Sequence, residues 1–197
     1  LMRGDRCGNG FHSLVTLTPL MITFSALKEQ IPKIHPFAWD HTFMVWSRAL
    51  GLGHLSWELL QPVLGHPPIT AAINFAYDVW FVVMFGGLIW QGFSARADAL
   101  RMQFLLAFAF AWFIGGSVLA VVFSSAGPCF YGHLFAQDPY HAQMIYLRAA
   151  ARDWPVWSVA IQDTLWRSYA TGDGGIAGIS AMPSLHVVVA VLIALLG

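Results

Sequence analysis

The sequence predicts an all-α protein, a bundle of helices that crosses a membrane several times. Of its 197 residues, 57% are hydrophobic and only 10% are charged, whereas an ordinary soluble domain is about a quarter charged. The mean hydropathy of +0.62 points the same way. The nine tryptophans gather near the ends of apolar runs, where an amphipathic ring prefers the lipid headgroup region. We expect residues 1–197 to form a single domain of an integral membrane protein.

Four apolar runs predict membrane helices, because a span takes about 20 mostly apolar residues. They cover residues 11–27, 69–90 and 103–123 and a last run that begins at Ser184. A signal peptide is the alternative for the first run, but no small-residue cleavage site follows it. In the third run, the step Gly-Gly-Ser at residues 115–117 would allow a neighbouring helix to approach closely.

Basic residues in the short segments indicate which ends of the spans share the cytoplasmic side. Two arginines lie between the second and third spans and two precede the first span: Arg96, Arg101, Arg3 and Arg6. Placing both segments in the cytoplasm sends residues 28–68 and 124–183 to the outer face. We expect the inner membrane of a bacterium, with the site on the periplasmic face; an organelle lumen is the alternative.

The two outer segments are expected to contain helices of their own. Residues 40–50 can form a short amphipathic helix that lies along the membrane surface, and an ordinary loop is the alternative. Helical patterning covers residues 141–152 and 156–169, with a break at Pro155. The following segment, residues 171–178, is rich in glycine.

The start of the last apolar run combines features that suit a phosphate. Pro183 disfavours helical structure for Met182, and Ser184 is a good N-cap, so His186 falls in the first turn of the helix. Free backbone N–H groups and the helix dipole favour an anion there. A bound phosphate would favour protonation of His186, which could then donate a proton. In the alternative, Ser184 only caps the helix and His186 is a polar residue at the membrane boundary.

The string GISAMPSLHV, at residues 178–187, resembles the second signature of the type 2 phosphatidic acid phosphatase superfamily, Pro-Ser-x-His at the start of a membrane helix. GISAMPS is especially similar to its inositolphosphotransferase-like branch, which includes the inositol phosphorylceramide synthases. Three shorter strings in the same order also resemble this branch: PFAWD, YDVWF and GPCFYG, at residues 36–40, 77–81 and 127–132. The resemblance implies six membrane helices. We therefore expect four of the six here, in a chain truncated at its C-terminus.

The resemblance also implies roles for individual residues. Ser184 would hold a phosphate oxygen, and His186 would protonate the leaving alkoxide. A second histidine, paired with an aspartate in the family's third signature, would attack phosphorus and form a phosphohistidine. The pattern of that signature, SRxxxxxHxxxD, does not occur in the sequence. These 197 residues are therefore expected to be inactive by themselves.

The family's first signature, KxxxxxxRP, supplies cations against the phosphate, and its expected region, residues 124–143, contains neither Lys nor Arg. Arg167 lies nearest the second signature, and we expect it to bind phosphate, with Arg148 and Arg152 as substitutes. The alternative for each is a charge that faces solvent or lipid headgroups. Lys28 and His35-Pro36 reproduce the spacing with histidine for arginine, but they follow the first span. We expect that match to be coincidental.

Composition argues against several other functions. Basic and acidic residues both number 10, so nucleic acid is not an expected partner. The histidines of the outer segments form no HxxH or HxxxH pair, and we expect neither a metal nor another cofactor. The two cysteines, Cys7 and Cys129, match no metal or redox spacing and are expected to be unpaired packing residues.

We therefore expect a membrane phosphatase that acts on a lipid-like phosphate ester, with the bilayer and a lipid phosphate as its partners. A phosphotransferase that moves an inositol-phosphate-type headgroup to a lipid acceptor would share the fold and the first chemical step, and it stays open. The non-enzymatic alternative is a transporter or structural subunit built around Asn74 and Asp78, whose polar groups must face protein or water at membrane depth. For Asp78 with Tyr77 we prefer a hydrogen-bonded strut between helices.

Overall fold

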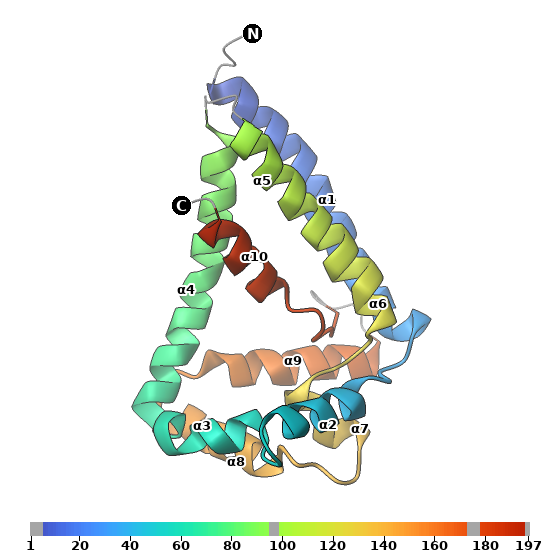
Figure 1. Cartoon of the computed structure of the whole chain (residues 1–197), viewed down its shortest axis with the longest axis vertical. Coiled ribbons are helices and arrows are strands. Elements are labelled where there is room, and N and C mark those ends of the chain that lie inside the picture. Colours follow the sequence, from blue (N-terminus) through green and yellow to red (C-terminus); the bar gives the residue numbers. More distant parts are fainter. Residues whose placement is uncertain (1–5, 95–98, 173–177, 196–197) are drawn as a thin grey trace.

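The computed structural model describes residues 6–94, 99–172 and 178–195. Within these ranges all regular structure is helical and no strand occurs, which confirms the predicted fold class. Long helices rise from a layer of shorter ones, and α10 (Leu185–Ala194) lies between them (Figure 1). Arg3 and Arg96 fall outside the described residues, as do the side chains of Arg6 and Cys7.

Three helices in the described ranges are long and apolar enough to cross a membrane. They are α1 (Arg6–Ile34), α4 (Pro67–Gly92) and a continuous helix made of α5 (Ala99–Phe110), the π-helical η1 (Ala111–Leu119) and α6 (Ala120–Val122). Each corresponds to one predicted run, and the third ends at Val122, one residue before the predicted end. The last run forms α10, which is apolar but shorter, so a fourth span stays a prediction.

The structure moves the end of the first helix. We expected an outer segment from residue 28 onward, but α1 continues to Ile34. Ile31 is only 1% exposed, so packing of the last two turns extends the helix beyond its apolar run. Lys28 therefore lies on a membrane helix rather than in a loop.

The outer layer consists of the helices that precede α4 and those that follow α6. They are α2 (Asp40–Leu50), α3 (Ser56–Leu64), η2 (Pro128–Phe130), α7 (Tyr131–Leu134), α8 (His141–Asp153) and α9 (Trp157–Thr171). The predicted helices at 40–50, 141–152 and 156–169 are confirmed. We did not predict α3. Its apolar residues Leu59, Leu60 and Val63 are exposed. At its start, the N–H of Leu55 donates to Glu58 Oε2 (2.8 Å).

All of these shorter helices lie at one end of the long helices, and the start of α1, the end of α4 and the start of α5 lie at the other (Figure 1). The two predicted outer segments therefore share a side. At the opposite end, Arg101 donates from Nε to the carbonyl of Gln91 (2.8 Å) and from a terminal nitrogen to that of Gly92 (3.1 Å). One of the arginines used to predict the topology thus caps the C-terminus of α4.

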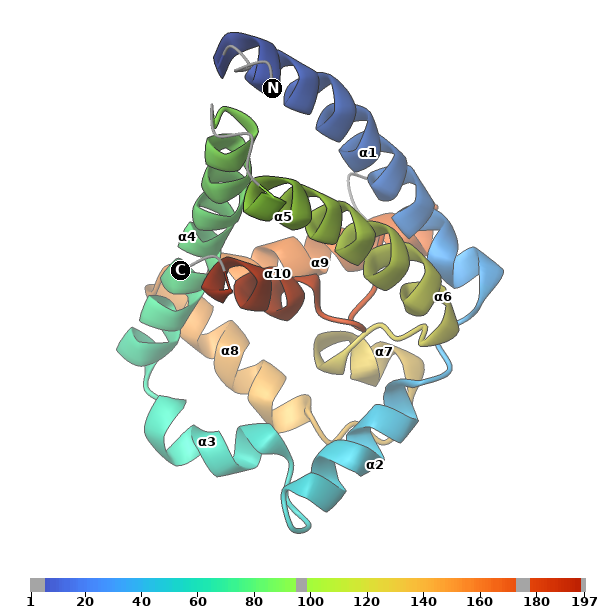
Figure 2. The ribbon, with the colours of Figure 1, turned by 45° about the horizontal axis from the view of Figure 1, so that its top comes forward.

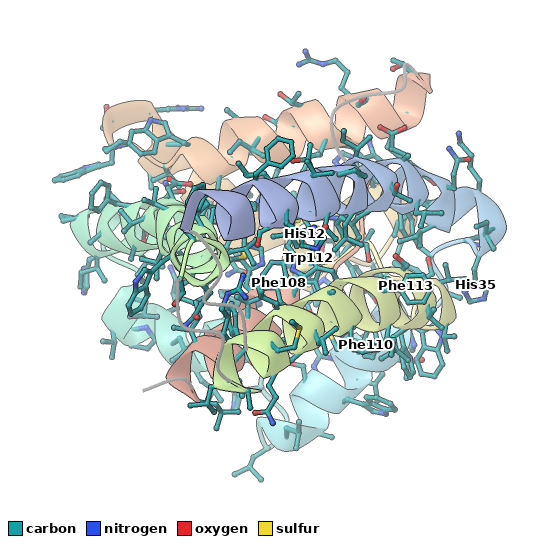
Figure 3. All side chains as sticks on the ribbon, turned by 90° about the horizontal axis from the view of Figure 1, so that it is seen from above. His12, His35, Phe108, Phe110, Trp112 and Phe113 are labelled. Atoms are coloured by element: carbon teal, nitrogen blue, oxygen red, sulfur yellow. The ribbon has the colours of Figure 1, made fainter. Side chains whose placement is uncertain are left out.

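The core that holds α10 is apolar. Its buried members come from α4, α5 and α10: Met84, Leu88, Phe104, Phe108 and Val189. Figure 2 shows α10 beside α4 and α5, and Figure 3 shows Phe108 and Trp112 between α1 and the α5–α6 helix. The predicted close approach occurs at Gly116, where a Cβ atom would overlap the Phe24 ring and crowd Leu185. This glycine lets α1 and the first residue of α10 share one face of η1.

Candidate functional site

The site is built around the start of α10. Ser184 occupies the N-cap position with an extended backbone (φ −76°, ψ 107°), and its carbonyl oxygen accepts the N–H of Val188 (3.2 Å). The predicted N-cap position is confirmed, but the Ser184 side chain makes no capping hydrogen bond, contrary to the alternative in which it only caps the helix. The half-buried hydroxyl is therefore not used by the helix that it begins.

His186 lies in the first turn, as predicted, and two aromatic rings of α4 hold it. The Tyr77 ring is tilted by 31° against it at a centroid distance of 4.9 Å. The Phe81 ring meets it edge-to-face at 5.1 Å. Because Tyr77 and Phe81 are four residues apart, they share a face of α4 and enclose the imidazole together. Both belong to the string YDVWF.

The Nε2 atom of His186 is buried and has no hydrogen-bond partner among the described residues. Buried polar atoms in folded proteins nearly always have a partner. A nitrogen without one, in the first turn of a helix and two residues from an uncommitted hydroxyl, is suited to a bound ligand.

The segment that leads into α10 packs against the other two short strings. Asp40, the last residue of PFAWD, accepts a hydrogen bond from the backbone N–H of Gly127, the first residue of GPCFYG (2.7 Å). Gly127 has a φ of +96°, and a Cβ atom there would lie 2.9 Å from the Cβ of Ala181. Strings that are far apart in the sequence therefore converge on the residues before Ser184.

Lys28 also belongs to this neighbourhood. The Gly178 backbone approaches α1 so closely that a Cβ atom at Gly178 would overlap the carbonyl of Lys28. The half-buried Lys28 side chain lies within electrostatic range of His186. His35, the other residue of the KxxxxxxRP-like match, bonds to a different segment: its Nδ1 donates to the carbonyl oxygen of Val121 (2.9 Å).

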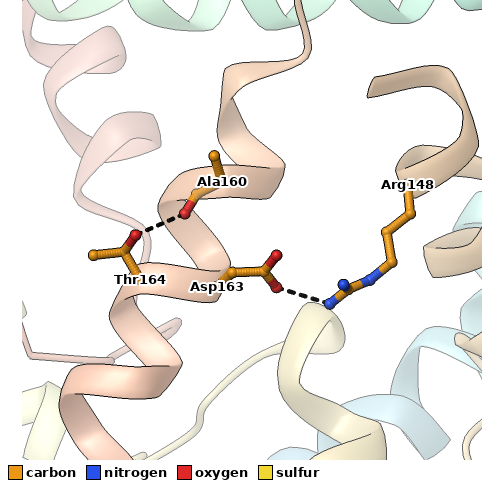
Figure 4. Close-up of polar contacts among 4 residues, drawn as sticks. All are labelled: Arg148, Ala160, Asp163 and Thr164. Carbon is orange, nitrogen blue, oxygen red and sulfur yellow. Dashed lines mark hydrogen bonds and ion pairs between the residues drawn. The ribbon is translucent and has the colours of Figure 1, made fainter. Parts of the chain in front are cut away.

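Among the described residues, the three arginines considered for phosphate binding make no hydrogen bond or ion pair to Ser184 or His186. Arg148 pairs with Asp163 of α9 at 2.8 Å, in the same turn of α9 in which the Thr164 hydroxyl donates to the Ala160 carbonyl (Figure 4). Arg152 and Arg167 are exposed. Within the described ranges, no hydrogen bond or ion pair joins Arg167 to Ser184 or His186. Its role as a phosphate ligand stays a prediction.

The polar residues inside α4 form a tie between helices. Asn74 is 5% exposed; its amide donates to Asp78 Oδ2 (2.9 Å), and its carbonyl oxygen accepts the N–H of Ser158 at the start of α9 (3.0 Å). The strut that we expected from Asp78 and Tyr77 thus involves Asp78 and Asn74. Tyr77 contacts His186 instead.

The described residues offer neither a cluster suited to a metal ion nor a reactive thiol. In the described part of the chain, no three His, Cys, Asp or Glu residues gather in a way that could hold a metal ion. Cys129 is a free, half-buried thiol. Burial, with a smaller contribution from the Asp40 charge, raises the pKa of this thiol to about 11, so it stays protonated and unreactive near neutral pH.

Sequence reasoning missed Lys28, Tyr77, Phe81 and Asp40 as neighbours of the site. The short strings PFAWD and YDVWF were a signal for three of them, because they contain Asp40, Tyr77 and Phe81. For Lys28 the signal was the KxxxxxxRP-like spacing to His35-Pro36, which we expected to be coincidental, and the structure places the lysine beside Gly178 but not His35.

A model of the PAP2 superfamily matches residues 41–196 of the chain. No curated protein and no solved structure shows a significant similarity to this chain. The matched residues extend from α2 to the end of α10 and include the Ser184 and His186 turn together with the α4 rings that enclose it. Since the match covers well over half of the sequence and includes the motif at residues 183–186, the chain belongs to the PAP2 superfamily.

Proposed function

We propose that this protein is a membrane phosphatase that hydrolyses a lipid-like phosphate ester through a phosphohistidine intermediate, with His186 as the general acid. Membership of the superfamily indicates phosphatase-type phosphoryl transfer on lipid-like substrates. The observation that carries the proposal is the buried, unpartnered Nε2 of His186 in the first turn of α10.

The groups around this nitrogen suit a phosphate dianion. The first turn of α10 presents backbone N–H groups that no helical carbonyl can accept. The Ser184 hydroxyl, which does not cap the helix, can donate to a second phosphate oxygen. Lys28, whose backbone lies against Gly178, is the cation that we propose on the α1 side, and Arg167 remains the cation that we predicted. We propose Lys28 ahead of Arg167 because its surroundings include Gly178 and His186.

The proposed chemistry takes two steps. A nucleophilic histidine forms an N–P bond while the P–O bond to the alkoxide breaks, and His186 donates its proton to the departing oxygen. Water then attacks phosphorus, the N–P bond breaks and inorganic phosphate leaves. The resemblance assigns the nucleophile to the family's third signature, whose pattern is not found in these 197 residues.

A lipid substrate is favoured by the level of the site. Asn74 ties α9 to α4, and Tyr77 and Phe81 follow within the next two turns. His186 therefore lies just beneath the outer layer, at the junction between that layer and the spans. There an acyl chain can stay in the bilayer while its phosphate reaches α10.

The proposed location is the inner membrane of a bacterium, with α2, α3 and α7–α9 on the periplasmic side. Leu52 is 93% exposed in the outer layer. In a Cys7→Ser background, Leu52→Cys should react with an impermeant maleimide added to intact cells, while Cys129, with its raised pKa, stays unlabelled. Labelling only after lysis would reverse the orientation.

The functional test uses the full-length protein in lipid nanodiscs. Phosphate release from a long-chain phosphatidic acid should exceed release from a short soluble phosphate ester. Protein that is quenched during turnover of a slowly hydrolysed substrate should carry acid-labile phosphohistidine. No release from any phosphate ester would reject the phosphatase. The genomic continuation gives an independent test, because a stop codon directly after Gly197 would leave no place for the nucleophile.

A phosphotransferase of the inositol phosphorylceramide synthase-like branch is the second candidate. The observation that favours it is the convergence of PFAWD, YDVWF and GPCFYG around α10. Product analysis with and without an added inositol or ceramide-type alcohol separates the two candidates. Transfer to the alcohol in preference to water would replace hydrolysis as the reaction. Catalytic inactivity toward both acceptors would favour the transporter or structural subunit.

A further inference from the structure

We infer that Asp40 is a positioning residue for the site, because its buried carboxylate holds the loop on which the approach to α10 is built. This inference rests on the proposed function only for its kinetic readout. The carboxylate is placed at the start of α2, where the helix dipole favours a negative charge. It is 4% exposed.

The carboxylate accepts three hydrogen bonds from one loop. Oδ1 accepts the Ser125 hydroxyl (2.7 Å) and the N–H of Gly127 (2.7 Å), and Oδ2 accepts the N–H of Ala126 (2.9 Å). Ser125 and Ala126 are themselves buried. A buried charge with this many short bonds is well compensated, and the bonds determine the path of the loop.

The same loop contacts the residues that precede Ser184. The carbonyl oxygen of Ser125 accepts the N–H of Ala181 (2.9 Å). Ile179 packs against Ala126 in a small buried cluster. Gly127 leaves no room for a side chain beside Ala181. Asp40 thus controls, through a single layer of contacts, the segment that ends three residues later at the N-cap of α10.

Backbone hydrogen bonds also connect the start of α2 to residue 124, so the Asp40 carboxylate is not the only contact that attaches α2 to this loop. The N–H groups of Ala38 and Trp39 both donate to the carbonyl oxygen of Ser124 (3.2 Å each). These bonds join backbone atoms and do not involve the Asp40 side chain, so we expect them to persist when it changes. The variant Asp40→Asn therefore tests the geometry of residues 125–127 rather than the presence of the outer layer.

Asp40→Asn replaces one acceptor oxygen with an NH2 group, which faces an N–H or hydroxyl donor whichever way the amide turns. We expect the loop and Ala181 to shift and the turn at Ser184 to shift with them. In the full-length protein, kcat should fall by about tenfold to a hundredfold, the scale of a small misplacement at a reacting centre. KM should change by less than about threefold, because the phosphate-facing groups remain.

The matched control is Glu58→Gln. Glu58 is also an outer-layer carboxylate that accepts a backbone N–H at the start of a helix, that of Leu55 (2.8 Å), but it belongs to α3. Its kcat should match that of the unmodified protein. If Asp40→Asn fails to fold, Ser125→Ala removes one of the three bonds and should lower kcat by a few fold.

A measurement that needs no activity completes the test. With isotope-labelled histidine in nanodiscs, the His186 imidazole signal is assigned by its loss in His186→Gln. It should shift in Asp40→Asn and stay in place in Glu58→Gln. An unchanged signal, or a loss of kcat that only follows the loss of folded protein, would overturn the inference. A shifted signal in a protein without phosphatase activity would uphold the positioning role and reject the proposed function instead.

Discussion

The membrane-spanning helices and the region around the start of α10 are held together by different forces. The spans make mainly apolar contacts and leave large side chains exposed toward lipid, such as Val82 at 72% and Ile22 at 66%. The approach to α10 and the outer layer depend on buried polar groups: Asp40 and Ser125 beside the approach, and Asn74 where α4 meets α9. The contrast teaches that the spans need only hydrophobicity and fit, whereas the candidate site needs particular atoms at particular places.

That difference predicts how substitutions act. An apolar change on the lipid side alters little, because lipid and protein are equally apolar there. Removing one buried acceptor near α10 leaves donors without partners in a medium of low dielectric constant.

The largest effect is expected for His186→Gln. If the imidazole is the general acid, turnover should fall at least about a hundredfold, because glutamine cannot deliver a proton. The control is His141→Gln, an exposed outer-layer histidine, which should leave turnover unchanged. Initial rates of phosphate release from the full-length protein measure both. Equal rates for the two variants would remove His186 from the chemistry.

The next effect tests fit inside the spans. Gly116→Ala places a Cβ against the Phe24 ring and Leu185, whereas Gly86→Ala meets no atom within 4 Å. Overpacking should destabilise the first variant by about 1–3 kcal/mol, and the second should be neutral or slightly stabilised. Thermal unfolding in one detergent compares them. Equal unfolding temperatures would mean that η1 is not in close contact with Phe24 of α1 and Leu185 of α10.

Asn74→Ala should have a comparable or slightly smaller effect on stability. It removes the acceptor of the Ser158 N–H and the donor to Asp78, and an unpaired buried group costs about 1–3 kcal/mol. Because the lost bond joins α4 to α9, proteolysis within α9 should become faster. The exposed Ile73 on the same helix provides the control, since Ile73→Ala should leave the proteolysis rate unchanged.

The smallest effect is expected for Lys28→Gln. Loss of one cation at the phosphate should weaken inhibition by inorganic phosphate about tenfold, in the range of a single charge-assisted hydrogen bond. Lys33, which is exposed near the end of the same helix, serves as the control. If Lys28→Gln and Lys33→Gln bind phosphate equally well, the cation must come from elsewhere, and Arg167 becomes the first candidate.

Particular elements show how far sequence reasoning reached. The helix at 40–50 was predicted because its polar and apolar residues alternate at helical spacing, and the structure has it as Asp40–Leu50. The helix Ser56–Leu64 was not, because Pro62 interrupts the pattern and its apolar residues face outward. For α1, the apolar run indicated the span but not its end, since burial of Ile31 depends on other helices.

In the candidate site, too, some features follow from neighbouring residues and others depend on contacts between distant segments. The place of His186 in the first turn of a helix follows from Pro183 and the apolar run after it, which are neighbours in the chain. The rings of Tyr77 and Phe81 lie more than a hundred residues away in sequence, and no local pattern connects them with His186.

By itself, the sequence determined the helical class, three spans and a serine and histidine at the start of a fourth apolar helix. These features depend on hydropathy and on backbone preferences within a few residues. Only the tertiary structure decided that Lys28, the Tyr77 and Phe81 rings and the Asp40 loop gather around that helix. Such contacts depend on how separate helices pack, because a buried hydrogen bond or ring contact forms only when two distant segments meet in the right register.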